Sequence, residues 1–137
     1  VSHHRLHEDF EGIDETIAMS SMYAANHLGA KVVATLTQTG KTALWMSRIS
    51  SNISIFAMSD NYKTLKKVTI YRGVYPCYIE KNSADDWNDV NSKVIESLLS
   101  KSVVVDKDIV IVTKGMHKDK SGGTNLMKIL RVGDGNY

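Results

Sequence analysis

The sequence predicts an α/β fold, a three-layer sandwich whose mixed five-stranded sheet carries helices on both faces. Five short runs rich in β-branched residues recur along the 137 residues, and the first four alternate with segments of helical spacing. This alternation implies right-handed crossovers and a largely parallel sheet. The fifth run follows the fourth with no room for a crossover helix, so we expect it to return antiparallel at an edge. Lys128 and Arg131 within it suit an edge that must not aggregate. The expected strand order is 3-2-1-4-5.

A helical segment precedes the first strand. Apolar or small residues recur in it every three to four positions, and Gly29 stands where a C-terminal cap belongs. The residues of this expected buried stripe are Ile13, Ile17, Ser21, Ala24 and Leu28. Residues 1–12 lack such spacing, so we expect a linker there and a single α/β domain over residues 13–137.

The remaining elements alternate along the chain. Strands are expected at 31–36, 53–58, 74–79, 108–113 and 126–132, and helices at 42–49, 61–68 and 87–100. In the last helix, Val90, Leu98 and either Val94 or Ile95 mark the buried stripe.

Composition and charge argue against several classes of function. Hydrophobic residues make up 42% of the chain and charged residues 23%, as in a soluble globular domain. A net charge of +2 with dispersed lysines is too mild for nucleic-acid binding. No apolar run approaches the roughly 20 residues that span a membrane. The single cysteine, Cys77, allows no internal disulfide, which suits the cytoplasm. Because the sequence begins with Val1, we expect it to be a piece of a longer chain.

The sharpest local feature is the turn between the first strand and the helix that follows it. Its residues are Thr37, Gln38, Thr39, Gly40, Lys41 and Thr42. A helix N-terminus presents unpaired backbone N–H groups and the positive end of its dipole. The threonine hydroxyls and Lys41 would complete a phosphate cradle, and Gly40 lets the backbone approach a ligand closely. The alternative is an ordinary capped turn with no binding role.

The same turn ends in Gly-Lys-Thr, as does the P-loop of nucleotide triphosphatases. That motif needs a glycine five residues before Gly40, and this position is Thr35. The spacing therefore argues against a nucleotide triphosphatase.

A second candidate segment connects the fourth and fifth strands over residues 114–125, where lysines, glycines and a histidine gather. Its candidate binding residues are Lys114, His117, Lys118, Lys120, Ser121, Gly122, Gly123 and Thr124. With the order 3-2-1-4-5, strand order reverses between the first and fourth strands, and ligands of doubly wound sheets bind at such a reversal. The turn and the loop would then face one crevice. A solvated connection is the alternative interpretation of the loop.

Other chemistry finds little support in the residues. His3, His4 and His7 lie in an unpatterned segment without partner cysteines or carboxylates at metal-ligand spacing, so we expect no metal site. No Gly-x-Gly-x-x-Gly follows a strand, which argues against a dinucleotide. Cys77 lies within a strand, where a core residue is expected. We assign no catalytic residue and no cofactor, and the residues alone favour a binding module over an enzyme.

An ordered set of segments resembles the C-terminal, effector-binding domain of bacterial pyruvate kinases. The segments are ETIAMS at 15–20, MYAANHL at 22–28, TQTGKTA at 37–43, SRIS at 47–50, IFAMS at 55–59, YRGVYP at 71–76, DIVIVT at 108–113 and SGGTN at 121–125. Their order and spacing follow the family over nearly the whole chain.

The resemblance implies a parent enzyme that transfers phosphate from phosphoenolpyruvate to ADP in glycolysis. In that family the active site, with Mg²⁺ and often K⁺, lies in a (β/α)₈ barrel, which has no counterpart here. We therefore expect this chain alone to be inactive. The family's C-terminal domain binds a phosphorylated activator and helps to assemble a homotetramer.

The resemblance also implies roles for particular residues. The 37–42 turn matches the segment that grips the effector's phosphate, and 114–124 matches the flexible effector loop. Relatives that bind fructose 1,6-bisphosphate use a Trp, matched by Trp87, and an Arg that has no match here. Lys93 lies about one residue away, and lysine is a poorer bidentate phosphate partner than arginine. This departure favours the bacterial class activated by AMP and sugar monophosphates.

Two other functions stay open at the level of sequence. The chain could be a stand-alone member of the same fold that binds or converts a small phosphorylated ligand. It could also be a purely structural assembly domain whose ligand site is vestigial.

Overall fold

The computed structural model describes residues 2–49, 51–80, 87–115 and 124–137, with side chains from Gly12 onward in the first helix and from Asp89 onward in the fourth. The helices are α1 (Ser2–Leu28), α2 (Lys41–Ser47), α3 (Tyr62–Val68) and α4 (Trp87–Ser100). The strands are β1 (Val32–Leu36), β2 (Ser54–Ser59), β3 (Val74–Tyr78), β4 (Ile109–Gly115) and β5 (Thr124–Arg131).

The five strands form one mixed sheet in the order β3-β2-β1-β4-β5. The pairs β1–β2, β1–β4 and β2–β3 are parallel, and β4–β5 is antiparallel. The predicted fold class and strand order are therefore confirmed. The reversal of strand order falls between β1 and β4, which pair Thr35 with Thr113 near their carboxyl ends.

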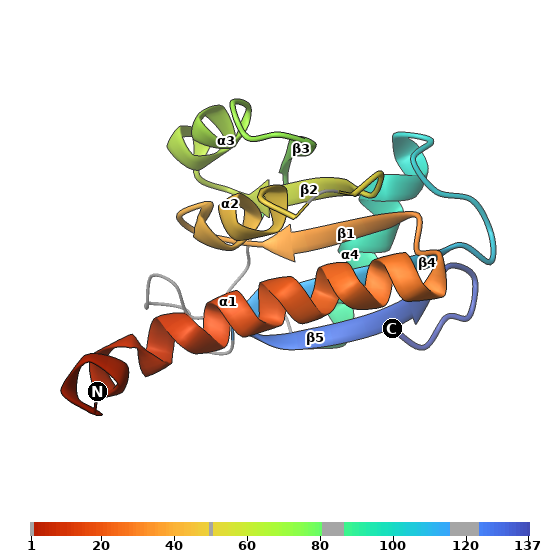
Figure 1. Ribbon diagram of the computed structural model, residues 1–137. Coiled ribbons are helices and arrows are strands. Elements are labelled where there is room, and N and C mark those ends of the chain that lie inside the picture. Colours follow the sequence, from red (N-terminus) through yellow and green to blue (C-terminus); the bar gives the residue numbers. More distant parts are fainter. Residues whose placement is uncertain (1, 50, 81–86, 116–123) are drawn as a thin grey trace.

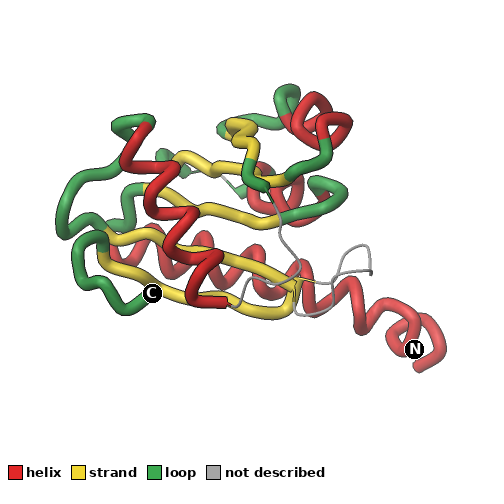
Figure 2. The backbone as a smooth tube through the Cα atoms, turned by 180° about the vertical axis from the view of Figure 1, so that it is seen from behind, coloured by secondary structure: helices red, strands yellow, loops and turns green. Residues whose placement is uncertain are grey.

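Helices cover both faces of the sheet, as Figures 1 and 2 show from opposite sides. On one face α1, α2 and α3 supply core residues such as Met22, Met46 and Val68. On the other face α4 packs Val94, Ile95 and Leu98 against the sheet, which confirms the stripe predicted for that helix. Since β1 and α2 are joined at one edge of this sandwich, the 37–42 turn lies where the parallel strands end.

The long helix α1 differs from the expectation in its start and in its buried stripe. It is helical from Ser2, although residues 1–12 carry no periodic apolar pattern, so the expected linker has a helical backbone. The boundary between linker and domain at residue 12 stays a prediction. Gly29 follows the helix with φ of 67°, the left-handed conformation expected of a cap.

The buried face of α1 is rotated from the predicted stripe. The side chains that are buried are Asp14, Ala18, Ser21, Met22 and Ala25, whereas Ile13 and Leu28 are 49% and 42% exposed. Small side chains at positions 18 and 25 let α1 approach the sheet closely, and Met22 fills the remaining space. Of the predicted stripe, Ser21 is buried and Ala24 packs against the core, so the spacing predicted the helix correctly and its core face only in part.

The β4 and β5 strands are longer at their shared end than the sequence indicated. β4 extends to Gly115 and β5 begins at Thr124, with a register shift between Lys114 and Gly115. Lysine, glycine and asparagine are poor strand formers, and here the pairing of neighbouring strands overrides that preference. No helix in the described part of the chain is long and apolar enough to cross a membrane.

Candidate functional site

The 37–42 turn is closed by hydrogen bonds from its own threonines. The Thr37 hydroxyl accepts the backbone N–H of Gly40 at 2.8 Å, and the Thr39 hydroxyl accepts that of Lys41 at 3.3 Å. The Thr37 N–H in turn donates to the Met58 carbonyl of β2 at 3.0 Å. A hydroxyl that accepts one hydrogen bond still has its own O–H to donate. The shape of the turn is thus held by its own hydrogen bonds, and each of the two hydroxyls keeps an O–H that can be donated to an anion.

Gly40 is the residue on which this shape depends. Its φ is 83°, which side chains of L-amino acids rarely adopt. A Cβ atom placed on it would lie 2.8 Å from Cγ1 of Val68 in α3, closer than carbon atoms normally approach. Both the backbone conformation and the packing therefore require glycine here.

The first turn of α3 supports the 37–42 turn from the other side. The buried Thr64 hydroxyl donates a hydrogen bond to the Gln38 carbonyl. Asn61 caps α3 by accepting the Lys63 N–H at 3.0 Å, which fixes where that helix begins. The sequence offered no motif for Thr64, because a single threonine inside a short helix carries no spacing signal.

A buried contact joins the turn to the beginning of β5. The hydroxyls of Thr42 and Thr124 lie 2.8 Å apart, and both side chains are almost fully buried. These residues are 82 positions apart in the chain. The two segments that the sequence predicted to share a crevice therefore meet at one of their ends. The Thr42 hydroxyl takes part in this contact, and its role as a phosphate ligand stays a prediction.

The described residues include only the ends of the expected effector loop. Lys114 and Thr124 belong to β4 and β5, and the irregular pairing at Lys114 and Gly115 stands directly before the loop. Bulges of this kind are common beside functional sites, where they redirect the chain. The expected loop residues outside the described part are His117, Lys118, Lys120, Ser121, Gly122 and Gly123.

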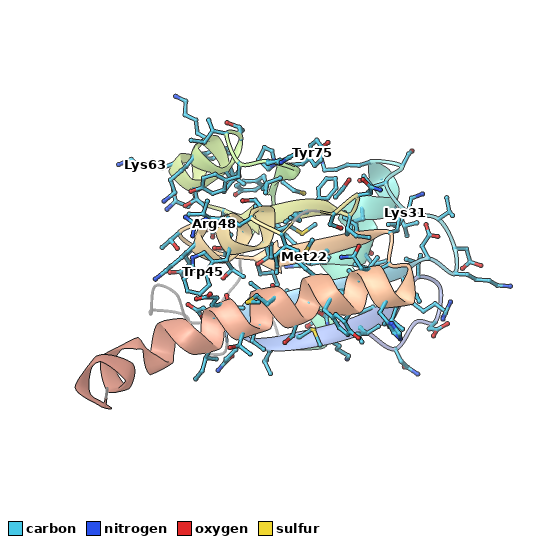
Figure 3. All side chains as sticks on the ribbon, viewed as in Figure 1. Met22, Lys31, Trp45, Arg48, Lys63 and Tyr75 are labelled. Atoms are coloured by element: carbon cyan, nitrogen blue, oxygen red, sulfur yellow. The ribbon has the colours of Figure 1, made fainter. Side chains whose placement is uncertain are left out.

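Lys41, the charged residue of the turn, contacts an aromatic ring. Its Nζ lies 5.3 Å from the ring centroid of Trp45, one turn further along α2. Trp45 is partly buried against the core that α1 and α2 share, and Figure 3 places it on the side of α2 nearest α1. The sequence analysis missed this partner of Lys41, although a Lys and a Trp four residues apart on a helix are close neighbours.

The two remaining candidate contacts are only partly located. α4 begins at Trp87 on the side of the sheet where β3 ends, so the backbone of this residue lies near the carboxyl ends of the parallel strands. Its side chain is outside the described part. Lys93 is partly buried six residues along α4, about 9 Å further from those strand ends. The roles of Trp87 and Lys93 toward a second phosphate stay predictions.

A stacked pair of tyrosines lies beside α3, near the carboxyl ends of the parallel strands. The ring centroids of Tyr62 and Tyr78 are 5.2 Å apart, with 18° between the ring planes. Lost hydration raises the pKa of the Tyr78 phenol above its usual value, and Tyr62 and the acidic Glu80 and Asp60 raise it further. The same carboxylates would repel a phosphate placed beside Tyr78.

The chemistry offered by the described residues is that of binding. The turn presents hydroxyl and ammonium groups, which suit phosphate oxygens. No three His, Cys, Asp or Glu side chains in the described part are grouped to hold a metal ion. Cys77 is buried in the core, as the sequence indicated, with its Sγ 3.2 Å from the Ser97 hydroxyl.

The fold and this edge define a doubly wound α/β domain with a candidate anion site at its switch point. A family model described as "Pyruvate kinase, alpha/beta domain" matches residues 15–130. The chain therefore belongs to the pyruvate kinase α/β domain family, as its resemblance to that family indicated.

Individual relatives agree with this assignment. The chain is 47% identical to a "Pyruvate kinase" of Buchnera aphidicola (subsp. Schizaphis graminum) and 45% identical to "Pyruvate kinase II" of Salmonella typhimurium. Each match extends over 133 residues, which is 96% of this chain and 27% of the relative. A "Pyruvate kinase" of the yeast Debaryomyces hansenii is 26% identical over 122 residues, 86% of this chain and 24% of that protein. The chain thus spans about a quarter of the length of these relatives.

Proposed function

We propose that this chain is the domain through which a cytoplasmic pyruvate kinase binds a phosphorylated activator. The observation that carries the proposal is the preformed 37–42 turn, joined to the start of β5 through Thr42 and Thr124. Thr37 and Thr39 donate their hydroxyls to the phosphate, and Lys41 supplies the positive charge. Charge-assisted hydrogen bonds of this kind contribute roughly 1.5–3 kcal/mol each.

The part of the activator beyond its phosphate is recognised by residues of the 114–124 loop. Lys118, Lys120 and His117 supply its contacts, and Trp87 lies on the same edge. The missing arginine and the position of Lys93 favour AMP or a sugar monophosphate over a bisphosphate. The activator regulates the enzyme because it prefers one arrangement of this loop, which biases the catalytic barrel. Phosphoryl transfer, with Mg²⁺ and K⁺, belongs to that barrel.

A second role, assembly of a homotetramer, rests on the apolar flank of α1 beside β5. Asn26 accepts a hydrogen bond from Ser51, which follows α2, so the opposite flank of α1 faces β5. That flank carries the periodic apolar residues that the core leaves half-exposed, Ile13 and Leu28, and β5 adds the half-exposed Ile129. Burying these side chains against a second copy would explain why their spacing is so regular.

Calorimetric titration of this chain with AMP, a sugar monophosphate and inorganic phosphate tests the binding role. Lys41→Glu should weaken the binding of all three by at least about tenfold, because it removes one charge-assisted bond and adds repulsion. The matched control is Lys31→Glu, which makes the same charge change at the exposed amino end of β1, on the opposite edge of the sheet (Figure 3). Binding that survives Lys41→Glu, or that Lys31→Glu weakens equally, would contradict the proposal.

A further inference from the structure

We propose that Trp45 restrains Lys41 in the ligand-free protein and competes with the phosphate for its ammonium group. This inference rests on the binding role proposed above and concerns a residue that no motif of the turn includes. The 5.3 Å distance from the Lys41 Nζ to the indole centroid is within the range of a cation–π interaction.

The direction of this contact decides whether Trp45 helps Lys41 to bind the phosphate or holds it away. Side chains on a helix lean toward its N-terminus, so the Trp45 ring lies over the flank of the first turn of α2. Trp45 is also packed against the core residues that α1 and α2 share, which keeps its ring on that flank. A phosphate held by the Thr37 and Thr39 hydroxyls would lie ahead of α2, away from the flank that carries the indole. On this arrangement the ammonium group leaves the indole in order to bind the phosphate.

The competition has a predicted size and sign. A cation–π contact at a partly exposed site corresponds to about a two- to fivefold change in an equilibrium constant. Trp45→Leu, which keeps an apolar side chain against the core but removes the π face, should tighten phosphate binding by about that factor. A residue that helped to orient Lys41 for the ligand would show the opposite change, so the sign alone separates the two roles.

The restraint acts on every anion that uses the Lys41 ammonium group. The same indole contact must be broken in each case, so the apparent affinity falls by one common factor. In Trp45→Leu, affinity for a singly charged anion, which gains less from the ammonium group, should therefore rise no more than affinity for phosphate.

A double-mutant cycle with inorganic phosphate as the probe tests the inference by calorimetry. The four proteins are wild type, Trp45→Leu, Lys41→Met and the double variant, with thermal unfolding measured for each. We expect Trp45→Leu to tighten binding in the wild type and to have no effect in the Lys41→Met background, since the ring is proposed to act on the ligand through Lys41. Tightening that persists without Lys41 would mean that Trp45 acts through packing, and would overturn the inference.

The contact itself is measured without any ligand by proton NMR. The side-chain protons of Lys41 should show an upfield ring-current shift in the wild type, reduced in Trp45→Phe and absent in Trp45→Leu. Saturating phosphate should remove the shift from the wild type. If phosphate binds but the affinity of Trp45→Leu is unchanged or weaker, this inference fails while the proposed function stands. If no variant binds phosphate or any phosphorylated ligand, the proposed function fails and the inference fails with it.

Discussion

Gly40 and Thr42 show at the scale of single residues how the turn is built before any ligand arrives. Gly40 combines a left-handed φ of 83° with close packing against Val68, and the Thr42 side chain is buried against Thr124. Gly40 has no side chain to offer a phosphate. Both residues keep the backbone and the hydroxyls of Thr37 and Thr39 in one arrangement, which reduces the entropy lost on binding.

Gly40→Ala should therefore destabilise the chain more than a strained backbone alone would. The left-handed conformation costs about 1–2 kcal/mol for a residue with a Cβ, and the 2.8 Å approach to Val68 adds roughly 1–3 kcal/mol of overpacking. Gly73→Ala is the control, because Gly73 has a φ of 71° and a methyl group there would meet open space within 4 Å. Urea unfolding compares the two variants, and equal losses of stability would show that the contact with Val68 is unimportant.

At the scale of secondary-structure elements, the alternation of strands and helices was enough to predict the sheet order, and every predicted element is present. Two features depend on tertiary contacts and could not be predicted. The β4–β5 pairing continues through Lys114 and Thr124, where strand propensity is low, because the neighbouring strand supplies the hydrogen bonds. The core face of α1 is set by how closely Ala18 and Ala25 let it approach the sheet, which apolar spacing does not encode.

The candidate site was likewise predictable in part, and the rest depends on tertiary contacts. The 37–42 turn could be predicted because its residues are contiguous and its position follows from strand order. The support from Thr64 could not, since a single threonine inside a short helix carries no spacing signal. The contact of Trp45 with Lys41 does have a signal, their four-residue spacing on a helix. The sequence also places Thr42 among the candidate phosphate ligands, which stays a prediction, and its contact with Thr124 could not be predicted because the two residues are 82 positions apart.

The contact between α2 and β5 through the hydroxyls of Thr42 and Thr124 can be tested by a double-mutant cycle on these two residues. Changing either residue to valine leaves the other buried hydroxyl without its partner, which costs about 1–3 kcal/mol. The double variant removes both hydroxyls, so its loss of stability should be clearly smaller than the sum of the single losses. Chemical denaturation measures all four proteins. Strictly additive losses would show that the two hydroxyls do not interact.

At the scale of the whole molecule, the two edges of the sheet differ in how they can meet another chain. β3 carries Pro76 in its middle, and a proline on an edge strand blocks further pairing. β5 exposes Ile129 beside the apolar flank of α1. Lys128 and Arg131 were expected to prevent aggregation at this edge strand. Both make hydrogen bonds within the chain: Lys128 donates to the Tyr137 carbonyl and Arg131 to the Lys107 carbonyl. The β5 edge is thus the better surface for assembly.

Ile129→Lys should shift this chain toward the monomer if the β5 edge mediates association. A charge in the middle of an apolar interface would have to be buried without a partner, which opposes association strongly. Ile70→Lys is the matched control, since Ile70 is 82% exposed after α3, far from β5 in the sheet order. Sedimentation velocity over a range of concentrations measures the change. An effect of Ile70→Lys as large as that of Ile129→Lys would contradict the assignment of the interface.

Hydrogen exchange of the backbone amides, with and without ligand, tests most directly whether the 37–42 turn is the phosphate site. With inorganic phosphate, the account predicts slower exchange at residues 37–42 and unchanged exchange over the 114–124 loop and over β3. With AMP or a sugar monophosphate that activates the enzyme, exchange should also slow over residues 114–124, because that loop contacts what lies beyond the phosphate. Unchanged exchange at residues 37–42 while a phosphorylated ligand is bound would contradict the account, since the ligand would then occupy another part of the molecule.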